Sequence, residues 1–367
     1  MLRKVFFVPA VMLLFCLVYL FTAPVPVEPV SWSAPQTNGY TGVFTTNHSL
    51  NDLSHISLEG EDGPEYMALA SDGLLYVSVA GGKILRMKPD GSQQEDFVNT
   101  GGRVLGFDFD SEGNLIAADA MKGLLSINHQ GTITTLVDHT DTTLPIFYAD
   151  AVVVAPDGLI FFTDASTRFA PKDWGGTLEA SILDIIEQSS TGRVLVYDPQ
   201  SRQTTVVLKG LSFANGLARS EDGTSLFVAE TGKYRIWKVD INTRNVDVSL
   251  PSSSAKILID NLPGYPDNLT RGKNGKIWVG LAKPRNAQVD SMAGFPFLRK
   301  VTLRLPRIMW PIPKAYGHVI AFSESGEILA SLQDPTGLYP ETTGVTETED
   351  RLYIQSLMAH DIGWKWK

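Results

Sequence analysis

Four segments of the sequence place an oxygen-bearing side chain just before an expected β-strand. They are Gly63-Pro64-Glu65, Tyr148-Ala149-Asp150, Phe213-Ala214-Asn215-Gly216 and Pro263-Gly264-Tyr265-Pro266-Asp267-Asn268. If the fold brought these segments together, three carboxylates and an amide would meet at one point. They would repel one another unless a hard cation lay between them, because such ions prefer carboxylate and amide oxygens as ligands. The residue types therefore predict a metal site, provided that the chain has a common axis.

A recurring strand–turn–strand unit supplies such an axis. Each unit has an Asp-Gly turn or a relative of one, a short apolar strand, a second turn and a second strand, as in 71–87. The turn glycines at positions 73, 113, 158, 223 and 275 are 40 to 65 residues apart, and a sixth turn lies at Glu349-Asp350. Periods of about 40–50 residues are typical of propeller blades. A β-sandwich does not require units of this length, so we predict an all-β fold, a six-bladed β-propeller.

Two long insertions interrupt the repeat. The first, Thr167 to Ser190, contains good helix formers with apolar residues at near-helical spacing in 178–187. The second, Lys283 to Gly317, combines many apolar residues with seven basic residues and the single acid Asp290. We expect helical lids over the propeller. The basic residues of 283–317 would then face water, or they would rest on anionic lipid.

The N-terminus indicates a membrane anchor. Arg3 and Lys4 precede nineteen uncharged residues, Val5 to Ala23, and the next basic residue is Lys83. This run is long enough to cross a bilayer, and its flanking charges predict a cytoplasmic N-terminus with an exported, extracytoplasmic remainder. A cleaved signal peptide is the alternative, but Phe21 and Ala23 make a poor cleavage site. We therefore expect a signal-anchor transmembrane segment at 1–23, a Pro-rich extended tether at 24–45 and the propeller at 46–367.

Composition excludes some classes of function. The formal net charge is −9 and the isoelectric point is about 5.2, which argues against nucleic acid as a partner because phosphate binding needs a basic face. Cys16 is the only cysteine, so the folded part contains no disulfide bond.

Several of these motifs, in this order, resemble the strictosidine synthase-like family of the adipocyte plasma membrane-associated type. That family is one of the calcium-dependent propeller hydrolases, which include paraoxonases and gluconolactonases. The resemblance runs from about Gly63 to Ser356. Beside the four segments above, it is carried by Ala118-Asp119-Ala120, Phe162-Thr163-Asp164-Ala165-Ser166, Tyr197-Asp198-Pro199 and Val228-Ala229-Glu230-Thr231.

The resemblance implies calcium near one end of the central tunnel. Carried over position by position, the ligands are Glu65, Asp150, Asn215 and Asp267, with Asn268 as an additional candidate. The chemistry agrees, since calcium takes six to eight oxygens and the sequence has no histidine or cysteine motif for zinc. This chain departs from many relatives in having Asp150-Ala151 where they have Asn-Asp. The extra carboxylate changes the charge presented to a substrate.

The leading hypothesis for function is hydrolysis of a lactone or an aryl or carboxylic ester. Calcium would polarise the carbonyl, and Asp267 is the first candidate for the base that activates water. Metal binding would lower its basicity, and the histidine alternatives are His129, His139 and His318. The partner would be a small apolar ester or lactone.

Two other hypotheses have a basis in the sequence. Glu347 falls near the glutamate with which strictosidine synthase condenses an amine with an aldehyde, but the rest of that pocket is not recognisable. A membrane-tethered binding or scaffold propeller, with calcium only holding the blades together, is the alternative of a different class. The sequence has no Gly-x-Ser-x-Gly elbow for a serine hydrolase.

Overall fold

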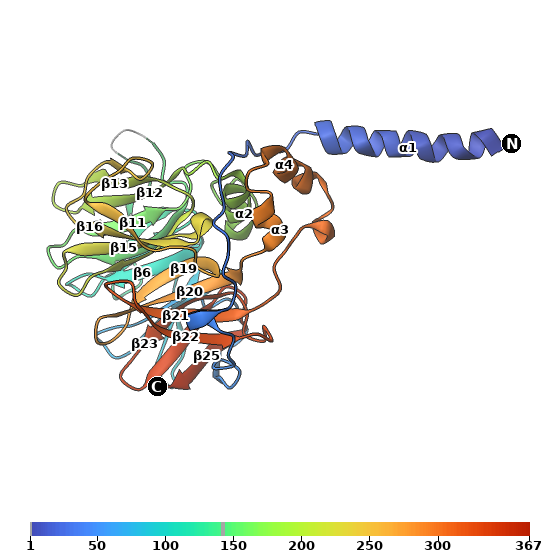
Figure 1. Cartoon of the computed structure of the whole chain (residues 1–367). Coiled ribbons are helices and arrows are strands. Elements are labelled where there is room, and N and C mark those ends of the chain that lie inside the picture. The colour runs from blue at the N-terminus through green and yellow to red at the C-terminus, as the bar shows by residue number, and fades with distance from the viewer. Residues whose placement is uncertain (1, 141–143) are drawn as a thin grey trace.

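The chain folds as a six-bladed β-propeller, as predicted (Figure 1). The computed structural model describes residues 2–140 and 144–367, and in the first helix it describes the side chains from Val11 onward. Each of the six sheets has four or five strands, and all pairings between the described strands are antiparallel except β13 with β17.

The blades follow one another along the chain, and each has its innermost strand first in the order below. The first three are β2 (Tyr66–Leu69), β3 (Leu75–Ser78), β4 (Lys83–Met87), β5 (Glu95–Asn99); β6 (Val104–Phe109), β7 (Leu115–Asp119), β8 (Gly123–Ile127), β9 (Ile133–Val137); and β10 (Ala149–Val154), β11 (Ile160–Asp164), β12 (Gly192–Asp198), β13 (Gln203–Leu211), β17 (Val246–Asp247). The last three are β14 (Ala214–Arg219), β15 (Ser225–Glu230), β16 (Arg235–Asp240), β18 (Ala255–Ile259); β19 (Gly264–Arg271), β20 (Lys276–Pro284), β21 (Gly317–Ser323), β22 (Ile328–Asp334); and β23 (Thr342–Glu347), β24 (Arg351–Ser356), β25 (Asp361–Trp366), β1 (Ser54–Ser57).

The six innermost strands form a closed ring, because β2, β6, β10, β14, β19 and β23 each contact the next one and β23 contacts β2. The last blade closes the ring by combining both ends of the chain. Its outer strand β1 comes from the N-terminal part of the chain and pairs with β25 near the C-terminus, in the register Ser54 with Trp364. The predicted common axis is therefore present.

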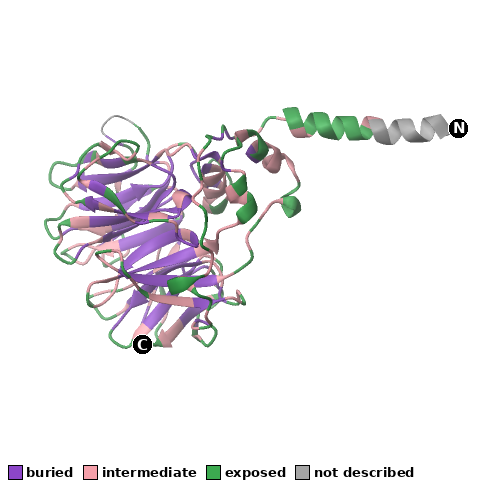
Figure 2. Cartoon of the chain, in the orientation of Figure 1, coloured by how far each residue is buried: buried purple, intermediate pink, exposed green. Residues whose placement is uncertain are grey.

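The strands form where apolar residues alternate with tight turns. In the first blade the Asp72 carboxylate accepts a hydrogen bond from the backbone N–H of Leu74 at 2.9 Å, and Gly73 takes the positive φ of 82° that the turn requires. The core lies between neighbouring sheets, so buried residues run along the strands while exposed residues lie in the connecting loops (Figure 2).

The insertions form helices at one end of the propeller. The first contains α2 (Thr177–Glu187), which confirms the helix expected at 178–187, and the second contains α3 (Ala287–Ser291), α4 (Pro296–Arg304) and the 3-10 turn η3 (Arg307–Met309). In Figure 1 these elements gather on the side from which the N-terminal helix projects. We call α2, α3, α4 and η3 the cap. Two further 3-10 turns are η1 (Gly42–Phe44) and η2 (Thr231–Lys233).

The N-terminal helix α1 spans Leu2–Thr22 and projects from the cap. Among the described residues, no helix is both long enough and apolar enough to cross a membrane, so the predicted transmembrane segment is not supported by the structure. The side chains of Arg3 and Lys4, on which the predicted orientation rests, lie outside those that the structure describes.

Residues 24–45, expected as a tether, have no regular structure apart from η1, and they lie against the cap and the propeller. Val27 is fully buried, and the backbone N–H of Val30 donates to the carbonyl of Glu187 at 2.8 Å. Further along, Gln333 donates from its amide to the carbonyl of Phe44 at 3.1 Å. This segment therefore contributes to the folded unit instead of hanging free.

Candidate active site and metal centre

Bulges in the innermost strands position the candidate ligands. The pairing register of β10 with β11 shifts between Ala149 and Val152, and Asp150 lies in that interval. The same irregularity occurs in β14 between Ala214 and Leu217, around Asn215, and in β19 between Pro266 and Leu269, around Asp267. A bulge turns a side chain away from its ordinary alternation. A bulge in the innermost strand therefore positions a candidate ligand in each of three separate blades.

The four predicted residues lie at the polar end of one cavity of about 550 Å³. Glu65 directly precedes β2, whereas Asp150, Asn215 and Asp267 belong to β10, β14 and β19. All four are buried. The structure therefore brings together the set that the sequence singled out, and we call this group the axial site.

The axial site concentrates acidic groups in a place poor in solvent. Burial, and then the neighbouring Glu65 carboxylate, raises the pKa of Asp150 well above its ordinary value. Burial followed by the charges of Glu65 and Asp150 does the same to the pKa of Asp267. Burial also raises the pKa of Glu65, although Arg103 and Asn268 oppose the shift. A cation at this point would reverse these costs, because it would stabilise the ionised forms.

Two buried amide oxygens point to the same conclusion. Oδ1 of Asn215 and Oδ1 of Asn268 have no hydrogen-bond partner in the structure, although buried polar atoms are nearly always paired. Among the described residues no three His, Cys, Asp or Glu side chains form a ready-made metal cluster. The axial set instead combines three carboxylates with amide oxygens, which is the donor chemistry of calcium. The residues present therefore fit that ion.

Neighbouring strands hold the axial residues in place. Asn268 Nδ2 donates to the Glu65 carbonyl at 3.0 Å, and the Thr343 hydroxyl donates to the same carbonyl at 2.7 Å. The strands also pass very close to one another. A Cβ atom built on Gly216 would lie 2.3 Å from the Asp267 carbonyl oxygen, so only glycine fits beside Asn215.

Arg103 is a site residue that the sequence reasoning missed. It directly precedes β6, lines the cavity, and places Nη2 3.3 Å from the Glu65 carboxylate. No motif marks it. Its position in the repeat could have indicated it, because Arg103 directly precedes β6 just as the axial residue Glu65 directly precedes β2.

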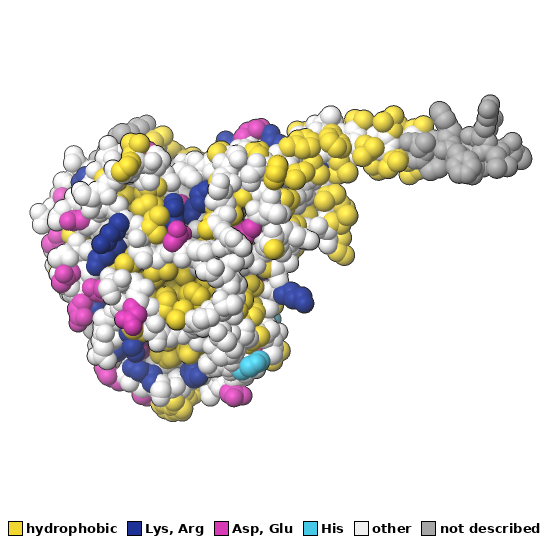
Figure 3. Space-filling model, viewed as in Figure 1, with side chains coloured by type: hydrophobic (Ala, Val, Ile, Leu, Met, Phe, Trp, Pro, Cys, Tyr) yellow, Lys and Arg dark blue, Asp and Glu magenta, His cyan; other side chains and the backbone are white. Residues whose placement is uncertain are grey.

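The rest of the cavity is mostly apolar, with some polar and charged side chains such as Gln188, Lys283 and Glu341 in its lining. Its wall and ceiling are formed mainly by hydrophobic side chains from the inner loops and the cap: Leu105, Met121, Tyr148, Phe213, Tyr265, Leu178, Ile182, Ile185, Ile186, Val289, Met292, Trp310 and Ile312. On the outer surface, hydrophobic side chains continue from the described part of α1 onto the adjoining part of the molecule (Figure 3). Exposed apolar residues of the cap include Phe297, Leu298 and Ile308.

The basic residues of the second insertion mostly hold the cap together. Buried Arg299 donates from Nη1 to the Ile186 carbonyl at 2.6 Å and from Nη2 to the carbonyls of Val30 and Ala293. It therefore joins α2, the N-terminal segment and the α3–α4 turn. Arg304 donates to the carbonyl oxygens of Leu20 and Ala23 at 2.9 and 2.6 Å, which ties the end of α1 to α4.

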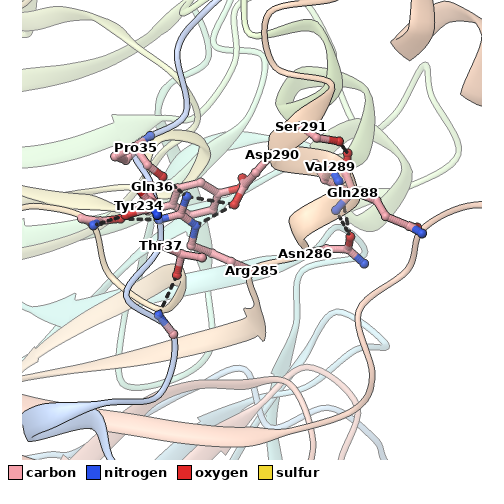
Figure 4. A network of polar contacts seen from close by, with 12 residues as sticks. Pro35, Gln36, Thr37, Tyr234, Arg285, Asn286, Gln288, Val289, Asp290 and Ser291 are labelled. Atoms are coloured by element: carbon pink, nitrogen blue, oxygen red, sulfur yellow. Dashed lines mark hydrogen bonds and ion pairs between the residues drawn. The ribbon is translucent and has the colours of Figure 1, made fainter.

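A second network fastens the N-terminal segment beside the cavity (Figure 4). The Arg285 guanidinium lies 4.2 Å from the centre of the Tyr234 ring and donates to Asp290 at 3.0 Å and to the Pro35 carbonyl at 2.5 Å. The Tyr234 hydroxyl donates to Asp290 at 2.9 Å, and Tyr265 lies within hydrogen-bond distance of that hydroxyl.

The other sequence candidates for chemistry lie away from the cavity. His129 and His139 are exposed, and buried His318 contacts the Ser331 hydroxyl at 3.0 Å while burial lowers its pKa to about 3. Glu347 accepts a hydrogen bond from Trp278 at 2.7 Å and pairs with Lys367 at 2.7 Å. None of these four lines the cavity.

The fold and the site define a class: a capped six-bladed propeller with a polar axial site beneath an apolar cavity. The family model for the SMP-30/Gluconolactonase/LRE-like region matches residues 62–294. The chain belongs to this family, and its curated relatives are strictosidine synthase-like and adipocyte plasma membrane-associated proteins, as the sequence motifs predicted.

Two of these relatives show how far the similarity extends. The chain is 30% identical to an adipocyte plasma membrane-associated protein of Salmo salar over 365 residues, which cover 93% of this chain and 84% of the relative. It is 35% identical to the protein strictosidine synthase-like 7 of Arabidopsis thaliana over 271 residues, 72% of this chain and 67% of the relative. Among solved structures, a gluconolactonase from Xanthomonas campestris has a TM-score of 0.60 at 16% identity and covers 94% of this chain and 99% of its own. This last match shows the fold alone.

Proposed function

We propose that the protein is a calcium-dependent hydrolase of lactones or of aryl and carboxylic esters. The observation that carries the proposal is the axial site itself, where acids and unpaired amide oxygens from four blades meet at the floor of an apolar cavity. Family membership supports it, because a solved relative of the same fold is a gluconolactonase and another is a calcium-binding protein, regucalcin.

Calcium would be held by Glu65, Asp150, Asn215 and Asp267, with the Asn268 amide oxygen as a further ligand. When bound, it would supply Lewis-acid polarisation of the substrate carbonyl. The apolar cap contributes by excluding bulk water, which strengthens electrostatic interactions inside the cavity.

Asp267 is the proposed base. A water molecule would add to the carbonyl carbon while the Asp267 carboxylate accepts its proton, and the bond to the ester or ring oxygen would break as that oxygen takes the proton up. A lactone thus gives a hydroxy acid, and an ester gives an acid and an alcohol. Burial and two neighbouring carboxylates raise the pKa of Asp267, and bound calcium would oppose this shift.

The test is hydrolysis of phenyl acetate and a panel of γ- and δ-lactones by the purified full-length protein. We expect turnover that disappears with EGTA and returns when calcium is added. Absence of turnover together with a calcium-dependent rise in melting temperature would contradict the enzyme and support a binding or scaffold propeller with structural calcium.

Membrane attachment is a separate proposal. It is supported by the apolar run Val5 to Ala23, by the exposed side chains Ile308 and Met309 on the adjoining cap, and by relatives named plasma membrane-associated proteins. Arg304 fixes the end of α1 against this surface. In this arrangement the N-terminus would be cytoplasmic and the propeller extracytoplasmic.

Vesicle flotation tests the attachment. We expect the full-length chain to float with neutral phosphatidylcholine vesicles and a chain that begins at residue 24 to remain in solution. Neutral lipid should suffice because Arg299, Lys300, Arg304 and Arg307 are already engaged within the protein. Flotation that requires anionic lipid, or that survives removal of residues 1–23, would contradict this proposal.

A further inference from the structure

Arg103 is fixed at the end of the cavity that holds the axial acids. Its backbone N–H donates to the Asp119 carboxylate at 3.1 Å, and its carbonyl accepts from the Ala120 N–H at 2.8 Å. The side chain is only 8% exposed and lines the cavity together with Glu65. A long, flexible cation is thus held at one place beside the axis.

The guanidinium of Arg103 is incompletely satisfied. Nη2 contacts Glu65 at 3.3 Å, but Nη1 has no hydrogen-bond partner in the structure. Leaving buried N–H groups unpaired is costly, and a guanidinium presents five of them in a planar fork. The free nitrogen therefore marks a place where an oxygen-bearing ligand would gain hydrogen bonds.

Arg193 is a buried arginine of the same chain whose guanidinium is hydrogen-bonded within the protein. It is similarly buried, pairs with Asp164 through Nε at 2.9 Å and Nη2 at 2.8 Å, and donates to the Pro145 carbonyl at 2.9 Å. Among the described residues, Arg299 and Arg351 also have a nitrogen without a hydrogen bond, but in both it is Nε. Arg103 differs in that the atom without a hydrogen bond is at the end of the side chain; it lines the cavity, as Arg299 also does.

The part of the cavity above Arg103 can accommodate an apolar group. The cavity has a volume of about 550 Å³, and its ceiling includes Ile182, Ile186, Met292 and Trp310. A ligand that bound Arg103 and also filled the apolar part of the cavity would carry one planar oxygen-bearing head group and an apolar tail. A carboxylate matches a guanidinium in planarity and charge.

We propose that Arg103 is the head-group-binding residue of the cavity, and that the cavity binds a carboxylic acid with a single apolar tail. This inference rests on the proposed function, since such an acid is what hydrolysis of the matching ester or lactone would release. Binding of this acid would require calcium in the axial site, because the three axial carboxylates would otherwise repel the ligand.

Calorimetric titration of the calcium-loaded full-length protein tests the assignment, with octanoate as the probe and octan-1-ol as a neutral probe of equal length. We expect octanoate to bind at least about tenfold more tightly than octan-1-ol, and Arg103→Gln to reduce that preference to about twofold or less. Arg193→Lys is the matched control: it alters a buried arginine–carboxylate pair outside the cavity and should keep the preference.

Arg103→Lys keeps the test decisive if Arg103→Gln does not fold, because lysine retains the charge beside Glu65 but lacks the planar fork. We expect it to lose at least about threefold of the preference. A wild-type protein that binds both probes equally would overturn the inference. So would a preference that survives in both Arg103 variants, since the carboxylate would then be held by the metal. Absence of hydrolysis alongside an Arg103-dependent preference would reject the hydrolase but leave this binding site standing.

Discussion

At the scale of single residues, the axial site is a collection of groups that are individually unfavourable where they lie. Asp150 and Asp267 are buried acids, and the side-chain oxygens of Asn215 and Asn268 are buried without partners. Such costs persist in a folded protein when they serve a function or a ligand. Calcium is the ligand that we propose here, because it would satisfy all of these groups at once.

Asp267→Asn should separate the two roles given to Asp267. Asparagine keeps the shape and one oxygen ligand but cannot accept the proton from water. We expect kcat to fall by roughly 100-fold or more while calcium still binds, though more weakly. The measurement is lactone turnover beside a calcium titration of the same preparation. Activity within about threefold of the wild type would remove Asp267 as the base.

The sequence predicted the axial residues better than their surroundings. Glu65, Asp150, Asn215 and Asp267 lie together because the repeat places them near the innermost strands of four of the six blades. Their roles as ligands and base stay predictions. The role of Arg103 could not be predicted in the same way. It depends on a contact with Glu65, 38 residues away in the sequence, and on an unpaired nitrogen that only the fold reveals.

At the scale of elements, helix α2 forms part of the ceiling of the cavity and carries an unusual buried acid on its inner side. Asp184 is fully buried, and neither of its carboxyl oxygens has a hydrogen-bond partner in the structure. Burial raises the pKa of Asp184 to about 7, an effect that nearby Ser166 opposes. Glu187, one turn on, is also buried but pairs with Arg168 at 2.6 Å.

The stability of α2 should therefore depend on pH. A carboxyl whose folded-state pKa is raised from 3.8 to about 7 contributes most stability below pH 4 and loses it as the pH rises through 7. We expect Asp184→Asn to raise the free energy of unfolding by about 1–3 kcal/mol at pH 8 and to change it little near pH 4. Chemical denaturation at both pH values measures this difference.

Glu187→Gln is the matched control, because it weakens a buried pair instead of removing an unpaired acid. It should destabilise the protein at pH 8, where Asp184→Asn stabilises it. An equal effect of Asp184→Asn at both pH values would show that the Asp184 carboxyl is not the titrating group.

The limits of sequence reasoning at this scale have a clear physical origin. Helix 178–187 was predictable because its apolar residues recur at helical spacing. The bulges around Asp150, Asn215 and Asp267 were not, because a register shift depends on the partner strand and leaves no local pattern. The basic residues of the second insertion face carbonyls and carboxylates of the cap, a pairing that composition cannot show.

At the scale of the whole molecule, the cap, the N-terminal segment and the propeller form one unit. The six-bladed ring followed from the spacing of the turns, and β1 closes it. The sequence did not indicate that residues 24–45 would pack against the cap and the propeller, since their prolines suggested only an extended chain. Arg299 in α4 joins this segment to α2.

Truncation tests whether the N-terminal segment belongs to the folded unit. A chain of residues 46–367 keeps β1 and so can close the ring, but it loses buried Val27 and the Val30 carbonyl that Arg299 contacts. Compared with residues 24–367, we expect its melting temperature to fall by at least about 2 °C. Faster hydrogen exchange in α2 and α4 should accompany the fall. Identical melting and exchange would mean that the segment is only a tether.

Calcium binding by the axial residues is tested by a calorimetric titration of the full-length protein with calcium. We expect one calcium ion per chain, with binding lost in Asn215→Leu, which keeps the size of the side chain but removes its oxygen. Asn47→Leu, at an asparagine bonded to Ser331 outside the axial site, should bind calcium like the wild type. Absence of calcium binding, or binding that Asn215→Leu leaves unchanged, would contradict the account.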